Sequence, residues 1–364
     1  MPAVIGDQPR HYERLNLIPD VVQTWEDGLR TGAVDGTFEW WYCDAHLEDG
    51  STLTVEFHTK PPFVSPKAPL TPFVLVTLTR ADGSRIDRTH TAAPHEFRAS
   101  TQQCDVTIGN NTFRGGPEGY TIHVEIENMV LDLKLSAQVP PWRPATGHAF
   151  FGADEEHYIA WLPTVARGSV FATLALDGET RQLTGSGYHD HNWGNVAPRK
   201  VLDHWYWGRA QLGEYTAVTL MFVSHEQYDR ALLPAVLVTR SGDVVVSAVG
   251  SDSVGFAERG TSVHPTTHVL VGSELEYRVA DHDGTYTITF RHEEDAFLLD
   301  FGTAGAYHRF LGAVELRLGG VSRSQTVTGH TLWELLHFAP KAPAQDGDPH
   351  ETGPVRIPVI GHHA

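Results

Sequence analysis

The residues best suited to chemistry lie between Gly185 and Asn195, where the chain reads Gly-Ser-Gly-Tyr-His-Asp-His-Asn-Trp-Gly-Asn. His189 and His191 stand two positions apart, so on a strand both side chains would lie on the same face. Asp190 would then lie on the opposite face, beside Tyr188. A carboxyl group between aromatic rings, next to a pair of imidazoles, suits proton transfer, hydrogen bonding or metal binding.

Three roles remain open for this segment. In the first, His189 and His191 hold zinc or iron together with His204 or another of the 22 histidines. In the second, an aromatic pocket raises the pKa of Asp190, so that the carboxyl stays protonated and acts as an acid or hydrogen-bond donor. In the third, the polar side chains only tie strands together. Because no third ligand is evident beside the two histidines, we predict no metal and favour the acid.

Two lone carboxylates stand among apolar residues elsewhere. Glu39 opens the run Glu-Trp-Trp-Tyr, and it is either a buried acid or a strand-end charge in solvent. Glu334 lies in the run Thr-Leu-Trp-Glu-Leu-Leu. It either forms a salt bridge with Arg209 or faces a cavity.

A second aromatic cluster runs from His204 to Trp207. On a strand, Trp205 and Trp207 share one face and Tyr206 takes the other. A barrel of about eight strands can hold one small ligand, and an aromatic-lined interior suits an apolar one. The alternative is that these tryptophans only plug the ends of a barrel.

The elements that must position these side chains are strands. Apolar and polar residues alternate along 51–58, 120–126 and 286–290, as in half-buried antiparallel strands. Turn signals such as Asp49-Gly50 separate the runs. The fold class is therefore predicted to be all-β, with one short helix within Leu15–Leu29.

Both halves of the chain begin with a Trp/Tyr cluster and end with a similar Thr-Gly motif, which indicates two related antiparallel barrels in tandem. Asn, Gly and Pro interrupt the strand pattern between Asp190 and Asp203, so the seam is placed there. We predict an N-terminal extension over residues 1–34, a first barrel over 35–190, a second barrel over 191–339 and a flexible tail over 340–364.

Charge and hydropathy limit the partners. The net charge of −18 repels phosphate backbones, so no nucleic-acid partner is expected. No stretch approaches 18 consecutive apolar residues, and the first residues lack the pattern of a secretory signal. We therefore expect a cytoplasmic monomer or homodimer with no membrane span.

Cofactor motifs are absent from the sequence. There is no Gly-x-Gly-x-x-Gly, no phosphate loop and no Gly-x-Ser-x-Gly elbow, and the two cysteines, Cys43 and Cys104, cannot form a Cys-type zinc site. No cofactor is predicted, and any chemistry would be proton or shape catalysis.

Three motifs in this order carry a family resemblance: Glu39–Tyr42, Gly187–Gly194 and Trp205–Gly208. Together they resemble the hydroxyneurosporene synthase (carotenoid 1,2-hydratase) and AttH-like superfamily. The resemblance implies two consecutive lipocalin-like barrels over about residues 35–338. It also implies acid-assisted chemistry on polyenes: water addition to a carotenoid, cyclisation of terpenoids or [4+2] cyclisation of polyketides. The aspartate that protonates an alkene in the hydratases maps by motif onto Asp190.

The sequence and the resemblance together predict a cofactor-independent cyclase or isomerase. Its substrate would be a hydrophobic polyene, a polyketide or terpenoid intermediate, closed by [4+2] or acid-assisted cyclisation in a cavity between the barrels. Asp190 is the predicted catalytic residue and Glu39 the second choice. The predicted substrate-binding residues are Trp40, Tyr42, Tyr188, His189, His191, Trp193, Trp205, Trp207 and Glu334. Alkene hydration, as in a carotenoid 1,2-hydratase, and non-catalytic carriage of a hydrophobic small molecule are the alternatives.

Overall fold

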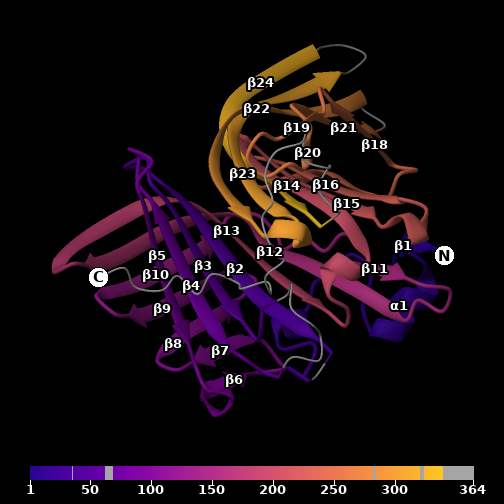
Figure 1. Cartoon of the computed structure of the whole chain (residues 1–364). Helices are drawn as coiled ribbons and strands as arrows, with labels where there is room; N and C mark the ends of the chain where they lie inside the picture. The colour runs from indigo at the N-terminus through magenta and orange to yellow at the C-terminus, as the bar shows by residue number, and fades with distance from the viewer. Residues whose placement is uncertain (35, 62–68, 282–283, 320–323, 339–364) are drawn as a thin grey trace, which may run out of the picture. The chain divides into compact units, whose positions relative to one another are not determined.

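A computed structural model describes residues 1–34, 36–61, 69–281, 284–319 and 324–338 (Figure 1). These residues form mostly antiparallel strands, in two sheets that curl into barrels, which confirms the predicted all-β class with tandem antiparallel barrels. The chain divides into two compact units. The first unit comprises Ala3–Lys200 with Gly242–Val244, and the second comprises Met1–Pro2, Val201–Ser241 and the chain from Val245 onward.

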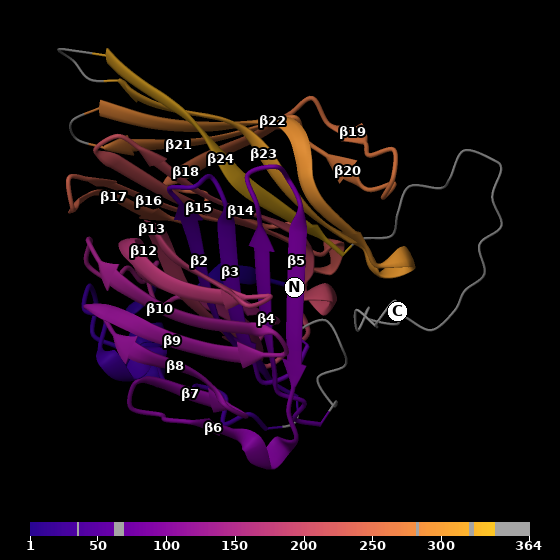
Figure 2. The same ribbon diagram turned by 90° about the vertical axis from the view of Figure 1, so that its left-hand side faces the viewer.

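The described part of the first unit forms one curled sheet with the strand order β5-β4-β3-β2-β13-β12-β10-β9-β8-β7-β6 (Figures 1 and 2). Strand β11 pairs with both β12 and β1. The bounds are β1 Ala3–Ile5, β2 Phe38–Leu47, β3 Thr52–His58, β4 Phe73–Thr79, β5 Arg85–Thr91, β6 Phe97–Ala99, β7 Cys104–Ile108, β8 Asn111–Gly116, β9 Gly119–Ile126, β10 Met129–Ala137, β11 His148–Phe151, β12 His157–Leu176 and β13 Glu179–Gly194, with single-turn 3-10 helices η2 Pro94–Glu96 and η3 Pro198–Lys200.

The alternation along β2 sorts its side chains between two faces of the sheet. Trp41, Cys43 and Ala45 enter the hydrophobic core, together with apolar residues of the neighbouring strands. Trp40 and Tyr42 point the other way and are half-buried. The two faces of this sheet are termed the core face and the outer face. Every candidate side chain of the first unit belongs to one or the other.

The second unit contains a smaller curled sheet with the order β17-β16-β15-β14-β24-β23-β22-β21-β18, and β19 pairs with β20. Its core includes Tyr206, Phe290 and Trp333. The bounds are β14 Leu202–Leu212, β15 Tyr215–Ser224, β16 Leu232–Arg240, β17 Asp243–Val249, β18 Val254–Arg259, β19 Ser262–Val263, β20 Leu270–Val271, β21 Glu274–Asp281, β22 Gly284–Asp300, β23 Ala306–Gly319 and β24 Ser324–His337, with 3-10 helices η4 Glu226–Tyr228 and η5 Gly302–Ala304.

The N-terminal segment is folded against the first sheet and holds the helix α1, Pro9–Leu15, and the 3-10 helix η1, Thr24–Asp27. The short helix predicted within Leu15–Leu29 corresponds to the 3-10 helix η1, and the α-helix α1 lies before this range and was not predicted. Pro9 suits the first turn of a helix, and Asn16 in the left-handed conformation ends α1.

Residues 190 and 191, where the sequence analysis divides the barrels, both lie inside β13, and the two units divide between Lys200 and Val201. The predicted tail, 340–364, lies outside the described residues. Among the described residues, no helix is both long and apolar enough to cross a membrane.

Candidate active site

Asp190 lies near the end of β13, which pairs with β2 on one side and β12 on the other. Its side chain belongs to the outer face, yet the residue is only 6% exposed. Its Oδ2 atom accepts hydrogen bonds from the Trp161 indole N–H at 2.7 Å and from the Tyr188 hydroxyl at 2.8 Å. Its Oδ1 atom accepts one from the Asn192 amide at 2.7 Å. All three donors are neutral.

This environment changes the acidity of Asp190. Burial raises the pKa of Asp190 to about 7, although the hydrogen bonds from Trp161, Tyr188 and Asn192 oppose that shift. Near neutral pH a substantial share of the molecules therefore carries a protonated Asp190. Because Oδ2 already accepts two hydrogen bonds and Oδ1 only one, the acid proton belongs on Oδ1.

Aromatic rings surround Asp190 on the outer face. Tyr42 stands directly opposite Asp190 in the β2–β13 register, and its ring lies edge-on to Tyr188 with centroids 6.4 Å apart. Trp40 stacks on His58 of β3 at 5.7 Å, and His58 stacks on Phe73 of β4 at 4.4 Å. The outer face thus combines one neutral acid with a row of stacked rings.

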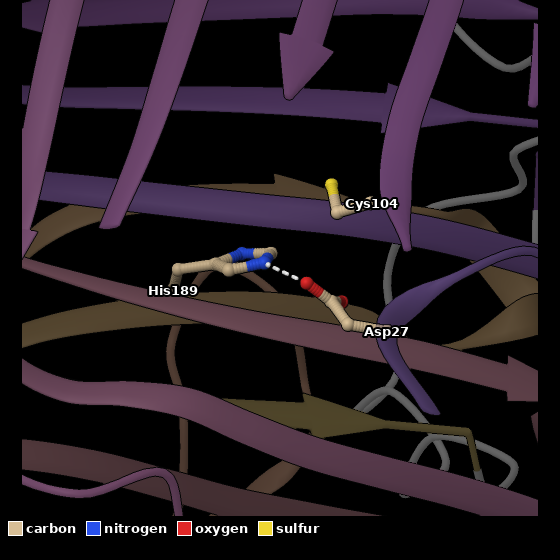
Figure 3. Close-up of side chains that lie close together, drawn as sticks. All are labelled: Asp27, Cys104 and His189. Atoms are coloured by element: carbon tan, nitrogen blue, oxygen red, sulfur yellow. Dashed lines mark hydrogen bonds and ion pairs between the residues drawn. The ribbon is translucent and has the colours of Figure 1, made fainter. Parts of the chain in front are cut away.

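The core face of the same strands carries a different polar group. His189 and His191 are both fully buried. The Nδ1 atom of His189 lies 2.7 Å from the Tyr42 carbonyl oxygen, which can only accept, so this nitrogen carries a proton. Its Nε2 atom faces the Asp27 carboxylate at 3.2 Å. Figure 3 shows these two side chains pointing toward each other, with Cys104 beside them.

Glu39 belongs to this core-face group and not to the site of Asp190. Its fully buried carboxylate accepts the backbone N–H groups of Arg30 and Thr31 at 2.7 and 2.8 Å. The Thr31 hydroxyl donates to it at 2.6 Å, and His191 Nε2 lies 2.8 Å away. The two carboxyls proposed as alternative acids therefore lie on opposite faces of one sheet, and Glu39 fastens the N-terminal segment to it.

A family model described as AttH-like matches residues 33–335, which is most of the chain. The protein belongs to the AttH-like family. The matched region contains Asp190, Trp161 and Glu39, whereas Asp27 precedes it.

Among curated relatives, the quinolone epoxide rearrangement protein penF of Penicillium thymicola is 27% identical over 244 residues, 65% of this chain and 63% of that protein. The match thus spans less than two thirds of that relative's length. The crystal structure of CghA with Sch210972 matches with a TM-score of 0.62 at 16% identity, over 83% of this chain and 89% of that chain. Kievitone hydratase from Nectria haematococca matches with a TM-score of 0.57 at 15% identity, over 89% and 95% of the two chains. These two likenesses establish the AttH-like, lipocalin-like fold.

Three groups of side chains in this AttH-like chain have metal-ligand spacing within the described residues: Asp27 with Cys104 and His189, Asp203 with His204 and His337, and His264 with Asp295 and His308. The first group supplies neighbours for His189 that the sequence does not reveal. Burial raises the pKa of the Cys104 thiol well above its ordinary value, so this sulfur is a poor ligand. The prediction that the site uses no metal stays a prediction.

The other residues predicted to bind substrate lie on the core face or in the second unit. Trp193 packs on His191 at 4.7 Å, on the core face. Trp205, Trp207 and Glu334 lie in the second unit, where Trp207 stands opposite Glu334 on the face away from the core. Glu334 accepts the Tyr307 hydroxyl at 2.5 Å and pairs with Arg309 at 3.4 Å.

Sequence reasoning missed two residues that bind the candidate side chains, Trp161 and Asp27. Trp161 lies in β12 beside Pro163, a residue that masks the strand pattern. Asp27 lies in the segment that the sequence analysis treats as an extension. The run Trp-Glu-Asp-Gly at 25–28, with two acids beside a tryptophan, is the one signal that could have drawn attention to it.

Proposed function

We propose that this protein is a cofactor-independent isomerase or cyclase that acts on a hydrophobic natural-product intermediate, with Asp190 as its acid. The observation that carries the proposal is a buried carboxyl, held by three neutral donors, whose pKa is raised to about 7. A general acid works best when its pKa lies near the working pH. Active sites are also where such perturbed carboxyls gather.

The chemistry follows from the proton on Asp190 Oδ1. This proton can pass to an oxygen of the substrate, such as an epoxide or carbonyl oxygen, or to an alkene carbon, and the charge left on Asp190 is stabilised by Trp161, Tyr188 and Asn192. If ring closure is a [4+2] reaction, the same O–H group donates a hydrogen bond to a carbonyl and withdraws electrons from the dienophile. Neither route adds or removes atoms.

The neighbouring rings favour an unsaturated or aromatic substrate. Trp40 and Tyr42 are half-buried on the face that bears Asp190, so both offer flat surfaces for stacking. Aromatic faces also stabilise positive charge that develops on a protonated substrate. The name of the relative penF, a quinolone epoxide rearrangement protein, provides a first compound class with both a flat ring and a basic oxygen.

The test is incubation of the purified protein with a quinolone epoxide and, separately, with a linear polyene, followed by mass spectrometry. A product of unchanged mass supports the proposal. A gain of one water mass identifies a hydratase, and binding without any product identifies a carrier, and either result would replace the proposal. Asp190→Asn is the paired control, because a product that it forms at the wild-type rate does not depend on this acid.

A further inference from the structure

A second ionisable pair shares the outer face with Asp190. His58 ends β3, and its Nε2 atom lies 2.8 Å from the Glu56 carboxylate. A carboxylate accepts hydrogen bonds, so Nε2 carries a proton, and in the neutral imidazole Nδ1 then has a free lone pair. Glu56 thereby orients the His58 imidazole and fixes its tautomer.

The free lone pair is unusual in its surroundings. His58 is only 5% exposed, and its Nδ1 atom has no hydrogen-bond partner among the described residues. A buried acceptor without a donor costs about 1–3 kcal/mol, so such an atom needs an explanation. A donor that arrives with a bound molecule provides one.

The strand register places His58 Nδ1 within a substrate's length of Asp190. Asp190 stands opposite Tyr42, and Tyr42 stands opposite Glu56, so the three side chains form one row across β13, β2 and β3. Adjacent strands are about 4.8 Å apart, which separates the ends of the row by about 10 Å. His58 stands in the next row along, opposite Trp40.

The rings beside His58 suit a flat ligand and a charged imidazole. Trp40 and Phe73 stack on the two sides of His58, with ring planes within 22° and 5° of parallel. Both rings are half-buried, so this part of the outer face is partly open. Their faces attract the positive charge that protonation would place on His58, and Glu56 is its counterion.

We infer that His58 is the base that complements Asp190, and that Glu56 is its positioning residue. The inference rests on the proposed function. A C–H or O–H bond of the substrate breaks, its proton passes to His58 Nδ1 and its electron pair stays on the substrate. Asp190 gives its own proton to a substrate oxygen or carbon. The substrate's composition is unchanged, and exchange with water returns one proton to Asp190 and removes one from His58.

The kinetic test uses the substrate that the mass-spectrometric assay identifies. His58→Gln should lower kcat about 10²-fold, within the usual range for a lost general base. Glu56→Gln, which leaves the ring stack intact, should lower kcat about tenfold with KM unchanged. The matched control is His123→Gln, because His123 forms a pair of the same 2.8 Å length with Asp132 at an exposed position, and kcat should not change. Wild-type kcat in both His58→Gln and Glu56→Gln, with Asp190→Asn inactive, overturns the inference and leaves the proposed function standing.

A second measurement does not depend on turnover. Long-range nitrogen–proton NMR of ¹⁵N-histidine-labelled protein distinguishes protonated from unprotonated ring nitrogens, and His58→Gln assigns the signal. The inference requires an unprotonated Nδ1 that shifts when the quinolone epoxide is added, while the His123 signals stay in place. A protonated His58 Nδ1 in the free protein, or a His58 signal that does not shift when the quinolone epoxide is added, overturns the inference even if Asp190 proves to be the acid.

Discussion

The paired strands β2 and β13 hold buried carboxyls on opposite faces of one sheet, in different electrostatic settings. On the outer face, Asp190 is held by an indole, a phenol and an amide, all neutral. On the core face, Glu39 is held by two backbone N–H groups, a hydroxyl and an imidazole. Both carboxyls are buried, and burial raises the pKa of Asp190 to about 7.

The comparison teaches that burial alone does not identify an acid. Each Glu39 oxygen accepts at least one backbone donor, and these donors belong to the N-terminal segment. A carboxylate that is saturated in this way fixes structure and has no position left for a substrate. Asp190 keeps one oxygen with a single donor, so the same functional group on the next strand stays available for chemistry.

The largest expected effect is on turnover at Asp190. Asn keeps the size of the side chain and one donor but cannot release a proton. Asp190→Asn should therefore lower kcat about 10²-fold or more, with little change in melting temperature. If Asp190 only donates a hydrogen bond, Asp190→Asn should be mildly impaired and Asp190→Ala severely.

Both variants need turnover and thermal unfolding measured side by side. A purely structural Asp190 would show the reverse pattern, in which both variants melt earlier and the folded fraction keeps its rate. Full activity in a folded Asp190→Ala protein would remove Asp190 from the site and break the comparison.

The second effect concerns pH. Turnover should fall about tenfold for each pH unit above 7, because the acid form of Asp190 is lost there, and the fall should be absent from the residual activity of Asp190→Asn. Stability changes in the same direction. The folded pKa of Asp190, about 7, exceeds the ordinary value of 3.8, so protonated Asp190 contributes to the free energy of unfolding. This contribution is complete below pH 4 and is lost as the pH rises to 7.

Denaturant unfolding of wild type and Asp190→Asn at pH 4.5, 6 and 7.5 checks the sign. The wild-type free energy of unfolding should fall relative to the variant's as the pH rises. If the difference between the free energies of unfolding of wild type and Asp190→Asn stays constant from pH 4.5 to 7.5, Asp190 is ionised in the folded protein throughout that range.

The third effect tests the core face. Glu39→Gln replaces one carboxylate oxygen with an NH2 group, which then faces the backbone N–H donor of either Arg30 or Thr31. We expect a loss of about 1–3 kcal/mol in the free energy of unfolding, or about 2–4 °C in melting temperature for each kcal/mol. The kcat of the folded protein should stay at the wild-type value. A kcat loss as deep as that of Asp190→Asn would assign Glu39 to the catalytic machinery.

The local part of this arrangement is predictable from sequence. Strict alternation with turn signals indicates antiparallel strands, and the spacing of His189, Asp190 and His191 separates the carboxyl from the imidazoles. Both rest on the period of two, which needs no knowledge of strand order. The α-helix α1 was not predicted, because only Pro9 and Asn16 mark its ends.

The partners of these residues are not predictable in the same way. Asp27 is 162 positions from His189 in sequence, and Trp161 is 29 positions from Asp190. Such contacts depend on strand order and register, and a shift of one residue would move each side chain to the other face. The stack of His58 on Trp40 and Phe73 likewise exists only because β2, β3 and β4 pair in this register.

The smallest effect sharpens the comparison with a matched pair of tyrosines. The Tyr188 hydroxyl donates to Asp190 at 2.8 Å on the outer face, and the Tyr120 hydroxyl donates to Asp27 at 2.7 Å on the core face. Tyr188→Phe removes a donor that favours the carboxylate, so the pKa of Asp190 should rise further. A hydrogen bond worth about 0.5–1.5 kcal/mol corresponds to about 0.5–1 pH unit. The falling limb of the pH–rate profile should therefore move to higher pH by that amount, with kcat at pH 6 nearly unchanged. Tyr120→Phe removes the same group from the other face and should leave the limb in place. A limb that moves in both variants, or in neither, would show that the phenol does not act through Asp190.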